Sequence, residues 1–83
     1  MIYYPNIDLL ESCKKSMFFR AYARKRIDEE GFYWNLRVGI DDPKDMHIHQ
    51  LYHICNADTY EELMIWCDIH GVTDVVTDVQ RMH

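Results

Sequence analysis

The chain has 83 residues, of which 48% are hydrophobic, 13% aromatic and 28% charged, and its 14 acids and 9 bases give a net charge of −5. This length, below the usual ~100–150 residues of a domain, excludes a second domain, and the many aromatic residues exclude a disordered chain. No apolar run approaches the ~18 residues of a membrane span, and the start lacks the basic region of a signal peptide. We therefore expect residues 1–83 to form a single cytoplasmic domain with no membrane contact.

The charge is unevenly distributed along the chain. Residues 13–26 contain six basic residues and no acid, whereas residues 32–83 contain nine acids and three bases. An acidic surface repels a phosphate backbone and is steered toward basic protein grooves. The three cysteines are odd in number and widely spaced, which favours reduced, partly buried thiols over a disulfide framework.

The first half of the chain predicts a short strand and a long helix. Met1–Tyr4 is a candidate strand, and Asn6 or Asp8 can cap a helix that begins after it. The basic and aromatic residues that follow give this helix an amphipathic but irregular pattern as far as Glu30. Gly31 is then placed to end it, as glycines often do after the last helical turn.

The middle of the chain predicts a hairpin. Phe32–Ile40 alternates apolar and other residues, which is typical of a strand, and residues 41–45 have the composition of a turn. Met46–Cys55 is ambiguous between a strand and a helix capped by Asp45. We favour the strand, because it would complete a hairpin with Phe32–Ile40.

A second helix and a last strand complete the predicted fold. Asp58 and Thr59 are each followed three residues later by Glu, a capping-box signal, and the helix should run to His70. Val72 to about Met82 is then the last strand. The order (β)αββαβ predicts a small two-layer α+β domain, an antiparallel sheet with two helices on one face, and with the first strand present the pattern is that of a ferredoxin-like fold.

A cluster of metal-ligand residue types lies on the ambiguous segment. In a strand His47, His49, His53 and Cys55 would share one face, and residues two apart lie ~6–7 Å apart at Cα, close enough to share a zinc ion. In the helix alternative His49 and His53 form an i, i+4 pair. We favour the simpler interpretation of a solvated polar face, and expect no cofactor.

No catalytic motif is present. The chain lacks a Walker loop, a G-x-G-x-x-G and a G-x-S-x-G sequence, and its three glycines are isolated. Cys67 lies on the predicted core face of its helix, and Cys55 has only His53 nearby, with no third group to orient that histidine. We therefore expect a protein that is not an enzyme.

Protein binding is the function class that the sequence favours. The chain has more large apolar and aromatic side chains than a core of this size can bury, and such side chains dominate binding interfaces. Two kinds of partner fit this interpretation, a hetero-partner and a second copy of the chain. The residues that we expect to contact it are the acidic loop, two aromatic residues and a basic stretch: Asp41, Asp42, Asp45, Phe19, Tyr33, Arg24, Lys25 and Arg26.

In general character, a small, acidic, aromatic-rich chain without an enzymatic motif is similar to the inhibitors, such as anti-restriction and anti-CRISPR proteins, that phages and mobile elements use against host nucleases. That likeness implies a viral or mobile-element accessory protein that inhibits a nucleic-acid-processing or defence complex. Direct nucleic-acid binding through the basic first helix is an alternative that we favour less, because basic residues on a helix usually form its solvated face. A small zinc-binding protein that uses the histidine-rich strand is the other alternative.

Overall fold

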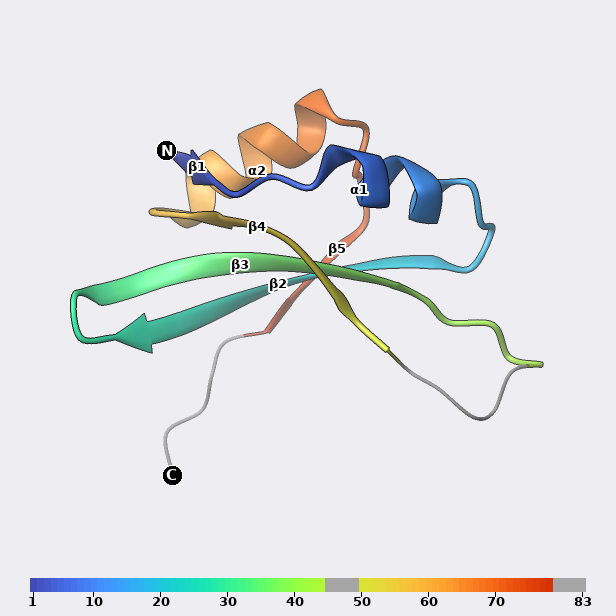
Figure 1. Ribbon diagram of the computed structural model, residues 1–83, viewed down its shortest axis with the longest axis horizontal. Helices are drawn as coiled ribbons and strands as arrows, with labels where there is room; N and C mark the ends of the chain where they lie inside the picture. Colours follow the sequence, from blue (N-terminus) through green and yellow to red (C-terminus); the bar gives the residue numbers. More distant parts are fainter. Residues whose placement is uncertain (45–49, 79–83) are drawn as a thin grey trace.

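The computed structural model describes residues 1–44 and 50–78. In this part of the chain two helices lie on one side of a five-stranded sheet (Figure 1). The elements are β1 (Ile2–Tyr3), α1 (Ile7–Lys14), β2 (Phe19–Asp28), β3 (Gly31–Ile40), β4 (Tyr52–Ala57), α2 (Tyr60–Ile69) and β5 (Val75–Asp78). The predicted α+β class is confirmed. None of the helices in the described ranges is long and apolar enough to cross a membrane.

The strands lie in the order β1–β4–β3–β2–β5. All neighbouring pairs are antiparallel except β2–β5, which is parallel, so the prediction of a fully antiparallel sheet is wrong at that edge. The reason is that β4 and β2 run in the same direction, because both are antiparallel to β3. The crossover through α2 carries the chain back to the end of the sheet where β4 starts, so β5 runs in that same direction. The ferredoxin-like arrangement is not observed either, because it requires βαββαβ and this chain has one strand more.

The largest error of the sequence prediction concerns the basic segment. The first helix was expected to reach Glu30, but α1 ends at Lys14 and residues 19–28 form β2. Alanine and arginine are good helix formers, which favoured the helix on local grounds. In the fold every residue of β2 pairs with β3, and Ala21 and Ala23 are fully buried. This tertiary pairing outweighs the local preference.

Gly31, which the sequence predicts to end the first helix, lies at the turn between β2 and β3. The side chain of Asp28 accepts a hydrogen bond from the backbone N–H of Glu30 at 2.8 Å. Gly31 follows with a φ of 125°, a region in which a side chain is strained. The glycine therefore begins a strand after a tight turn and does not end a helix.

In the ambiguous segment, the residues that the structure describes form a strand. Tyr52–Ala57 pairs with β3, which confirms the predicted hairpin, whereas residues 45–49 lie outside the described part of the chain. The register shifts between Leu36, which pairs with Cys55, and Arg37, which pairs with His53. Ile54 is the extra residue of this β-bulge, and for this reason Ile54 and its neighbour Cys55 are both fully buried.

The second helix follows the prediction closely. The Thr59 side chain caps α2 by accepting a hydrogen bond from the N–H of Glu62 at 3.2 Å. Leu63 and Cys67 are buried on its inner face, and Gly71 follows the helix with a φ of 72°. Both the N-terminal signal and the apolar face could be read from the sequence, because helix-capping residues and a 3.6-residue period coincide there.

The core lies between the two helices and the sheet face that they cover. The last strand starts later than predicted, at Val75, and residues 79–83 lie outside the described part. Both helices pack against β3 and β4. The buried residues are Leu10, Cys13, Ala21, Ala23, Leu36, Val38, Ile54, Cys55, Ala57, Leu63, Cys67 and Val72.

We expect Gly39→Ala to lower the free energy of unfolding by about 1–3 kcal/mol. A Cβ at Gly39 would lie 2.9 Å from the carbonyl oxygen of Gln50 and 3.0 Å from a methyl carbon of Leu51. The backbone oxygen can withdraw only if the chain shifts. Urea unfolding measures the loss, and Lys44→Ala, an exposed change in the following turn, serves as the control. If the Gly39→Ala variant had the same free energy of unfolding as the wild-type protein, residue 50 would not approach β3 as closely as described.

Candidate functional site

The face of the sheet opposite the helices, here called the open face, carries the chain's most distinctive surface. No helix in the described ranges packs against it (Figure 1). Alternation along each strand and the cross-strand register define its members. They are Tyr3, Arg20, Tyr22, Arg24, Arg26, Asp28, Tyr33, Asn35, Arg37, His53, Asn56 and Val76, and the register pairs Asp78 of β5 with Arg24.

The register places each tyrosine of the central strands beside an arginine. Tyr22 on β2 pairs with Arg37 on β3, and Arg26 on β2 pairs with Tyr33 on β3. Directly paired residues have Cβ atoms about 4.5–5.5 Å apart, so each ring and guanidinium are neighbours. All four side chains are half-buried, which holds them against the sheet while leaving part of each accessible.

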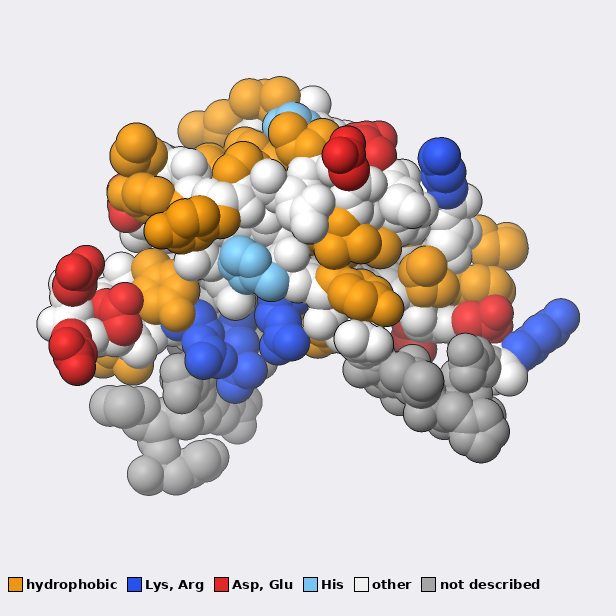
Figure 2. Space-filling view, in the orientation of Figure 1, with side chains coloured by type: hydrophobic (Ala, Val, Ile, Leu, Met, Phe, Trp, Pro, Cys, Tyr) orange, Lys and Arg blue, Asp and Glu red, His pale blue; other side chains and the backbone are white. Residues whose placement is uncertain are grey.

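The open face concentrates positive charge. With Arg20 and Arg24 it has four guanidinium groups, and Figure 2 shows a cluster of Lys and Arg side chains on the side away from the helices, with other basic side chains apart from it. Within the described residues no carboxylate forms an ion pair with Arg20, Arg26 or Arg37. Guanidinium groups with spare donors bind phosphate and carboxylate oxygens in a bidentate manner. The face can therefore bind an anionic partner.

Polar side chains occupy the strand next to this charge. His53 Nε2 lies 2.7 Å from the Asn56 Oδ1 atom, in a hydrogen bond along β4. Asn35 lies between Asn56 and Arg24 in the register, and its Oδ1 is buried with no hydrogen-bond partner in the described part of the chain. A buried acceptor without a partner is costly, so a donor from a bound molecule or a water would be favourable at this position.

The basic residues of the predicted partner-binding set are divided between two faces. Arg24 and Arg26 lie on the open face, where Arg26 meets Tyr33, another predicted contact residue. Lys25 points to the other side, with its Nζ atom 4.4 Å from the centre of the Phe32 ring. Phe19, the other predicted aromatic contact, is half-buried like Tyr33 and packs against the core.

Of the predicted acidic loop, Asp41 adjoins one end of the open face, where it lines a second pocket with Arg20 and Tyr22, but it lies far from Tyr33. Asp41 follows β3 at the end opposite Tyr33, and eight strand residues at ~3.3 Å each separate them by about 26 Å. The Asp42 side chain accepts a hydrogen bond from the N–H of Lys44 at 2.9 Å, which stabilises the local turn. Asp45 lies outside the described residues. The structure therefore does not bring the predicted contact residues into one site.

The predicted histidine face is not formed as expected. His47 and His49 lie outside the described residues. The bulge at Ile54 places His53 on the open face and Cys55 in the core, so the prediction that these two share a face is wrong. Across residues 1–44 and 50–78 no group of three or more His, Cys, Asp or Glu residues is arranged to hold a metal ion. Zinc binding stays the less favoured alternative, and the absence of a cofactor stays a prediction.

The buried thiols are poor nucleophiles. Burial raises the pKa of the Cys55 thiol to about 12, with a smaller contribution from the charge of Cys67. Burial likewise raises the pKa of Cys67 to about 11. Since the thiolate is the reactive form, both groups stay protonated and unreactive at neutral pH.

These thiols should make the fold sensitive to alkali. In the folded protein both pKa values lie above the ordinary 9.0, so the folded state retains protons that the unfolded state loses. Their contribution to stability is complete below pH 9 and is lost as the pH rises through 11 and 12. We expect the free energy of unfolding, measured with urea, to fall over this range more steeply than in a Cys55→Ala/Cys67→Ala variant. Equal slopes would contradict the burial of the thiols.

Comparisons with known proteins do not add a family. No protein-family model matches this chain, and neither a curated protein nor a solved structure matches it significantly. The site therefore has to be interpreted from its own residues. The sequence prediction placed Arg20 and Tyr22 on the basic first helix and not on a sheet, and it missed Arg37 as a contact residue. Arg20, Tyr22, Arg24 and Arg26 recur every second residue, and this period is the sequence signal that indicates most of the open face.

Proposed function

We propose that the protein is a non-catalytic binding module whose open face binds a single-stranded nucleic acid. The observation that carries the proposal is the segregation of charge: a chain with a net charge of −5 places four arginines and three tyrosines on one uncovered sheet face. Arginines neutralise phosphates, and tyrosine rings provide surfaces on which bases stack. The acidic remainder of the surface would orient a nucleic acid toward this face.

The dimensions of the sheet favour a single strand over a duplex. Five strands spaced about 4.8 Å apart form a face about 19 Å wide, which exceeds the ~12 Å width of the B-DNA major groove. A flexible single strand can lie across such a face with its bases turned toward the rings, as in other sheets that bind RNA. Arg20 and Arg26 are six residues apart on β2, a span of about 20 Å that a few nucleotides can follow.

Fluorescence anisotropy with a labelled oligonucleotide of about ten nucleotides tests this function. The four arginines predict that the logarithm of the association constant falls with the logarithm of the salt concentration, with a slope of about −2 to −3. A duplex of the same sequence should bind more weakly. Absence of binding at low salt, or binding that salt does not weaken, would contradict the proposal.

A protein partner is the second candidate function, and the outer side of α2 favours it. Ile65 and Ile69, one turn apart, are 62% and 72% exposed, as the sequence prediction of surplus apolar residues anticipated. An exposed apolar pair on a helix is a suitable contact for another protein or for a second copy of this chain. A module that binds a single strand through its sheet and a protein through α2 would act within a nucleic-acid-processing complex, and inhibition of such a complex remains our proposal for its biological role.

Analytical ultracentrifugation and affinity capture test the second candidate. A homodimer predicts a concentration-dependent sedimentation coefficient that Ile65→Ser/Ile69→Ser abolishes. A hetero-partner predicts one stoichiometric protein captured by the wild-type chain and lost with the same double variant. A monomer that captures no protein would contradict this candidate and leave the nucleic-acid proposal intact.

A further inference from the structure

A pocket of about 420 Å³ lies beside the β2–β3 turn, between that turn and strands β1 and β4. This volume is within the range of about 300–1,000 Å³ that is usual for small-molecule sites. The residues that line it are Tyr3, Tyr4, Asp28, Glu30, Gly31, Phe32, Tyr33, Asn56 and Asp58. The pocket thus combines aromatic rings with three carboxylates, and no arginine or lysine lines it.

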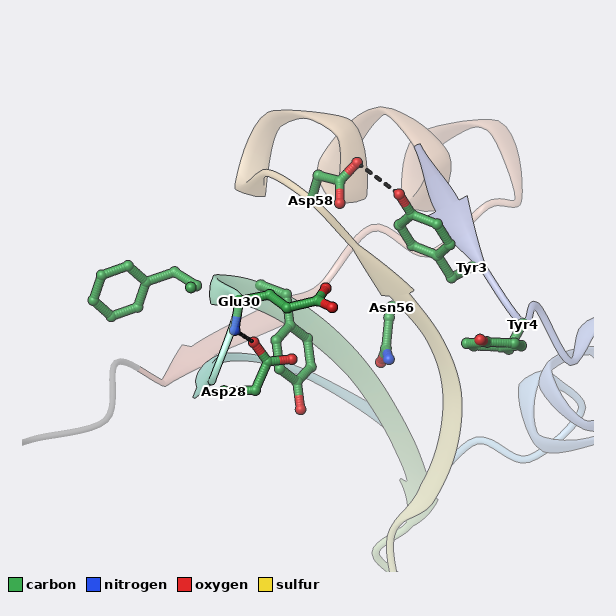
Figure 3. A pocket seen from close by; sticks show the side chains of 9 residues that line it. Tyr3, Tyr4, Asp28, Glu30, Asn56 and Asp58 are labelled. Carbon is green, nitrogen blue, oxygen red and sulfur yellow. Dashed lines mark hydrogen bonds between the residues drawn. The ribbon is translucent and has the colours of Figure 1, made fainter.

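Each side of the opening carries both aromatic and acidic side chains, because Asp58 lies beside Tyr3 and the residues Phe32 and Tyr33 follow the turn that carries Asp28 and Glu30. Figure 3 shows Asp28 and Glu30 on the turn side, facing Tyr3, Tyr4 and Asn56 across the pocket. The rings of Tyr3 and Tyr4 lie with their centres 6.4 Å apart and are tilted by 42°. Tyr4 is 80% exposed. A group that enters the pocket would therefore meet both aromatic rings and carboxylates.

The carboxylates leave the pocket with unbalanced negative charge. Asp58 accepts a hydrogen bond from the Tyr3 hydroxyl at 3.1 Å and lies 3.6 Å from the N-terminal ammonium group, so its charge is partly balanced. The described part of the chain supplies no such ion pair to Asp28 or Glu30. The hydrogen bond to Asp58 is the main cause of a raised Tyr3 pKa, and the charges of Asp58 and Glu30 raise it further. The electrostatic potential at Tyr3 is thus negative.

We propose that this pocket binds an alkylated ammonium group, free as a small quaternary amine or carried on a methylated lysine side chain. Ring faces attract such a cation and contact its methyl groups, and nearby carboxylates balance its charge without the directed hydrogen bonds that a bare ammonium requires. The pocket volume leaves room for the rest of a small amine or for a peptide segment. Tyr3, Tyr33 and Asn56 belong both to this pocket and to the open face, so the two proposed sites adjoin, but cation binding in the pocket does not require nucleic-acid binding.

An NMR titration with choline and with its uncharged isostere 3,3-dimethyl-1-butanol tests the proposal. Choline should shift the signals of Tyr3, Tyr4 and Glu30 and bind at least about tenfold more tightly than the isostere, because only choline has the charge. A short peptide with trimethyllysine, compared with the same peptide carrying leucine at that position, separates the two sources. Tighter binding of the trimethyllysine peptide than of choline assigns the site to a protein side chain, and the reverse assigns it to a free amine. Equal affinity for choline and its isostere, or no binding of any cation at about 10 mM, would overturn the proposal.

A pair of neighbouring acids provides the matched variants. Glu30 lines the pocket, whereas Glu29 is exposed on the same turn and does not line it. Glu30→Gln should weaken choline binding by about tenfold, and Glu29→Gln should leave it within about twofold. Tyr4→Leu, which keeps an apolar side chain but removes the ring, should also weaken it. Equal losses in the two glutamate variants would show a general effect of charge and would contradict a specific site.

Discussion

Replacing Leu36 with alanine should remove a large part of the stability of this protein. Leu36 is fully buried on the covered face of β3, where it pairs with Ala23 on one side and Cys55 on the other. Leucine-to-alanine changes in such cores cost about 2–5 kcal/mol, because the lost methyl groups leave a cavity. A chain of 83 residues has a stability of only about 4–12 kcal/mol at the usual ~0.05–0.15 kcal/mol per residue.

Urea unfolding, followed by tryptophan fluorescence, measures this loss. Trp34 and Trp66 both pack against the core, so their emission reports its integrity. Ile65→Ala serves as the control, because this isoleucine is 62% exposed and its removal should change stability by no more than about 0.5 kcal/mol. Similar losses for the two variants would mean that β3 does not lie at the centre of the core.

Removing two arginines from the open face should reduce oligonucleotide affinity by at least about 100-fold. Arg26 and Arg37 each flank a tyrosine on this face. A hydrogen bond to a charged group is worth about 1.5–3 kcal/mol, and about 1.4 kcal/mol corresponds to a factor of ten in affinity. The double variant Arg26→Gln/Arg37→Gln should also make the salt dependence shallower by about 1.4 units of slope, because two phosphate contacts are lost.

Lys25 offers a control one residue away in the same strand. Its side chain lies on the opposite face, over the ring of Phe32. Lys25→Gln removes a positive charge at nearly the same place in the sequence, yet it should change the affinity by no more than about threefold, the effect expected of a screened distant charge. If Lys25→Gln weakened binding as strongly as Arg26→Gln alone, overall charge rather than the open face would account for the affinity.

The fold was predictable where local and tertiary preferences agree. Residues 58–71 combine a capping threonine, an apolar helical face and a terminal glycine, and α2 forms as expected. The alternation in Phe32–Ile40 likewise predicts β3, because a strand covered on one side needs that period. In both elements the residues that favour the conformation are also those that the core requires.

The candidate site was less predictable, because it depends on pairing between distant segments. Residues 19–28 are rich in helix formers, and only their pairing with β3 turns Arg24 and Arg26 to one face and Lys25 to the other. The bulge at Ile54 separates His53 from Cys55, and a one-residue shift of this kind is not visible in a hydrophobic pattern. The acidic pocket arises where β1, the β2–β3 turn and β4 meet, a contact that no sequence motif indicates.

Mapping of a bound oligonucleotide by NMR tests the central proposal most directly. Titration of the isotope-labelled protein with a single strand of about ten nucleotides should shift the signals of the open face, with the largest changes at Tyr22, Tyr33 and Arg37. The signals of α1 and α2, on the other side of the sheet, should change little. Shifts concentrated on the helices, or spectra that do not change at low salt, would contradict a nucleic-acid-binding role for the open face.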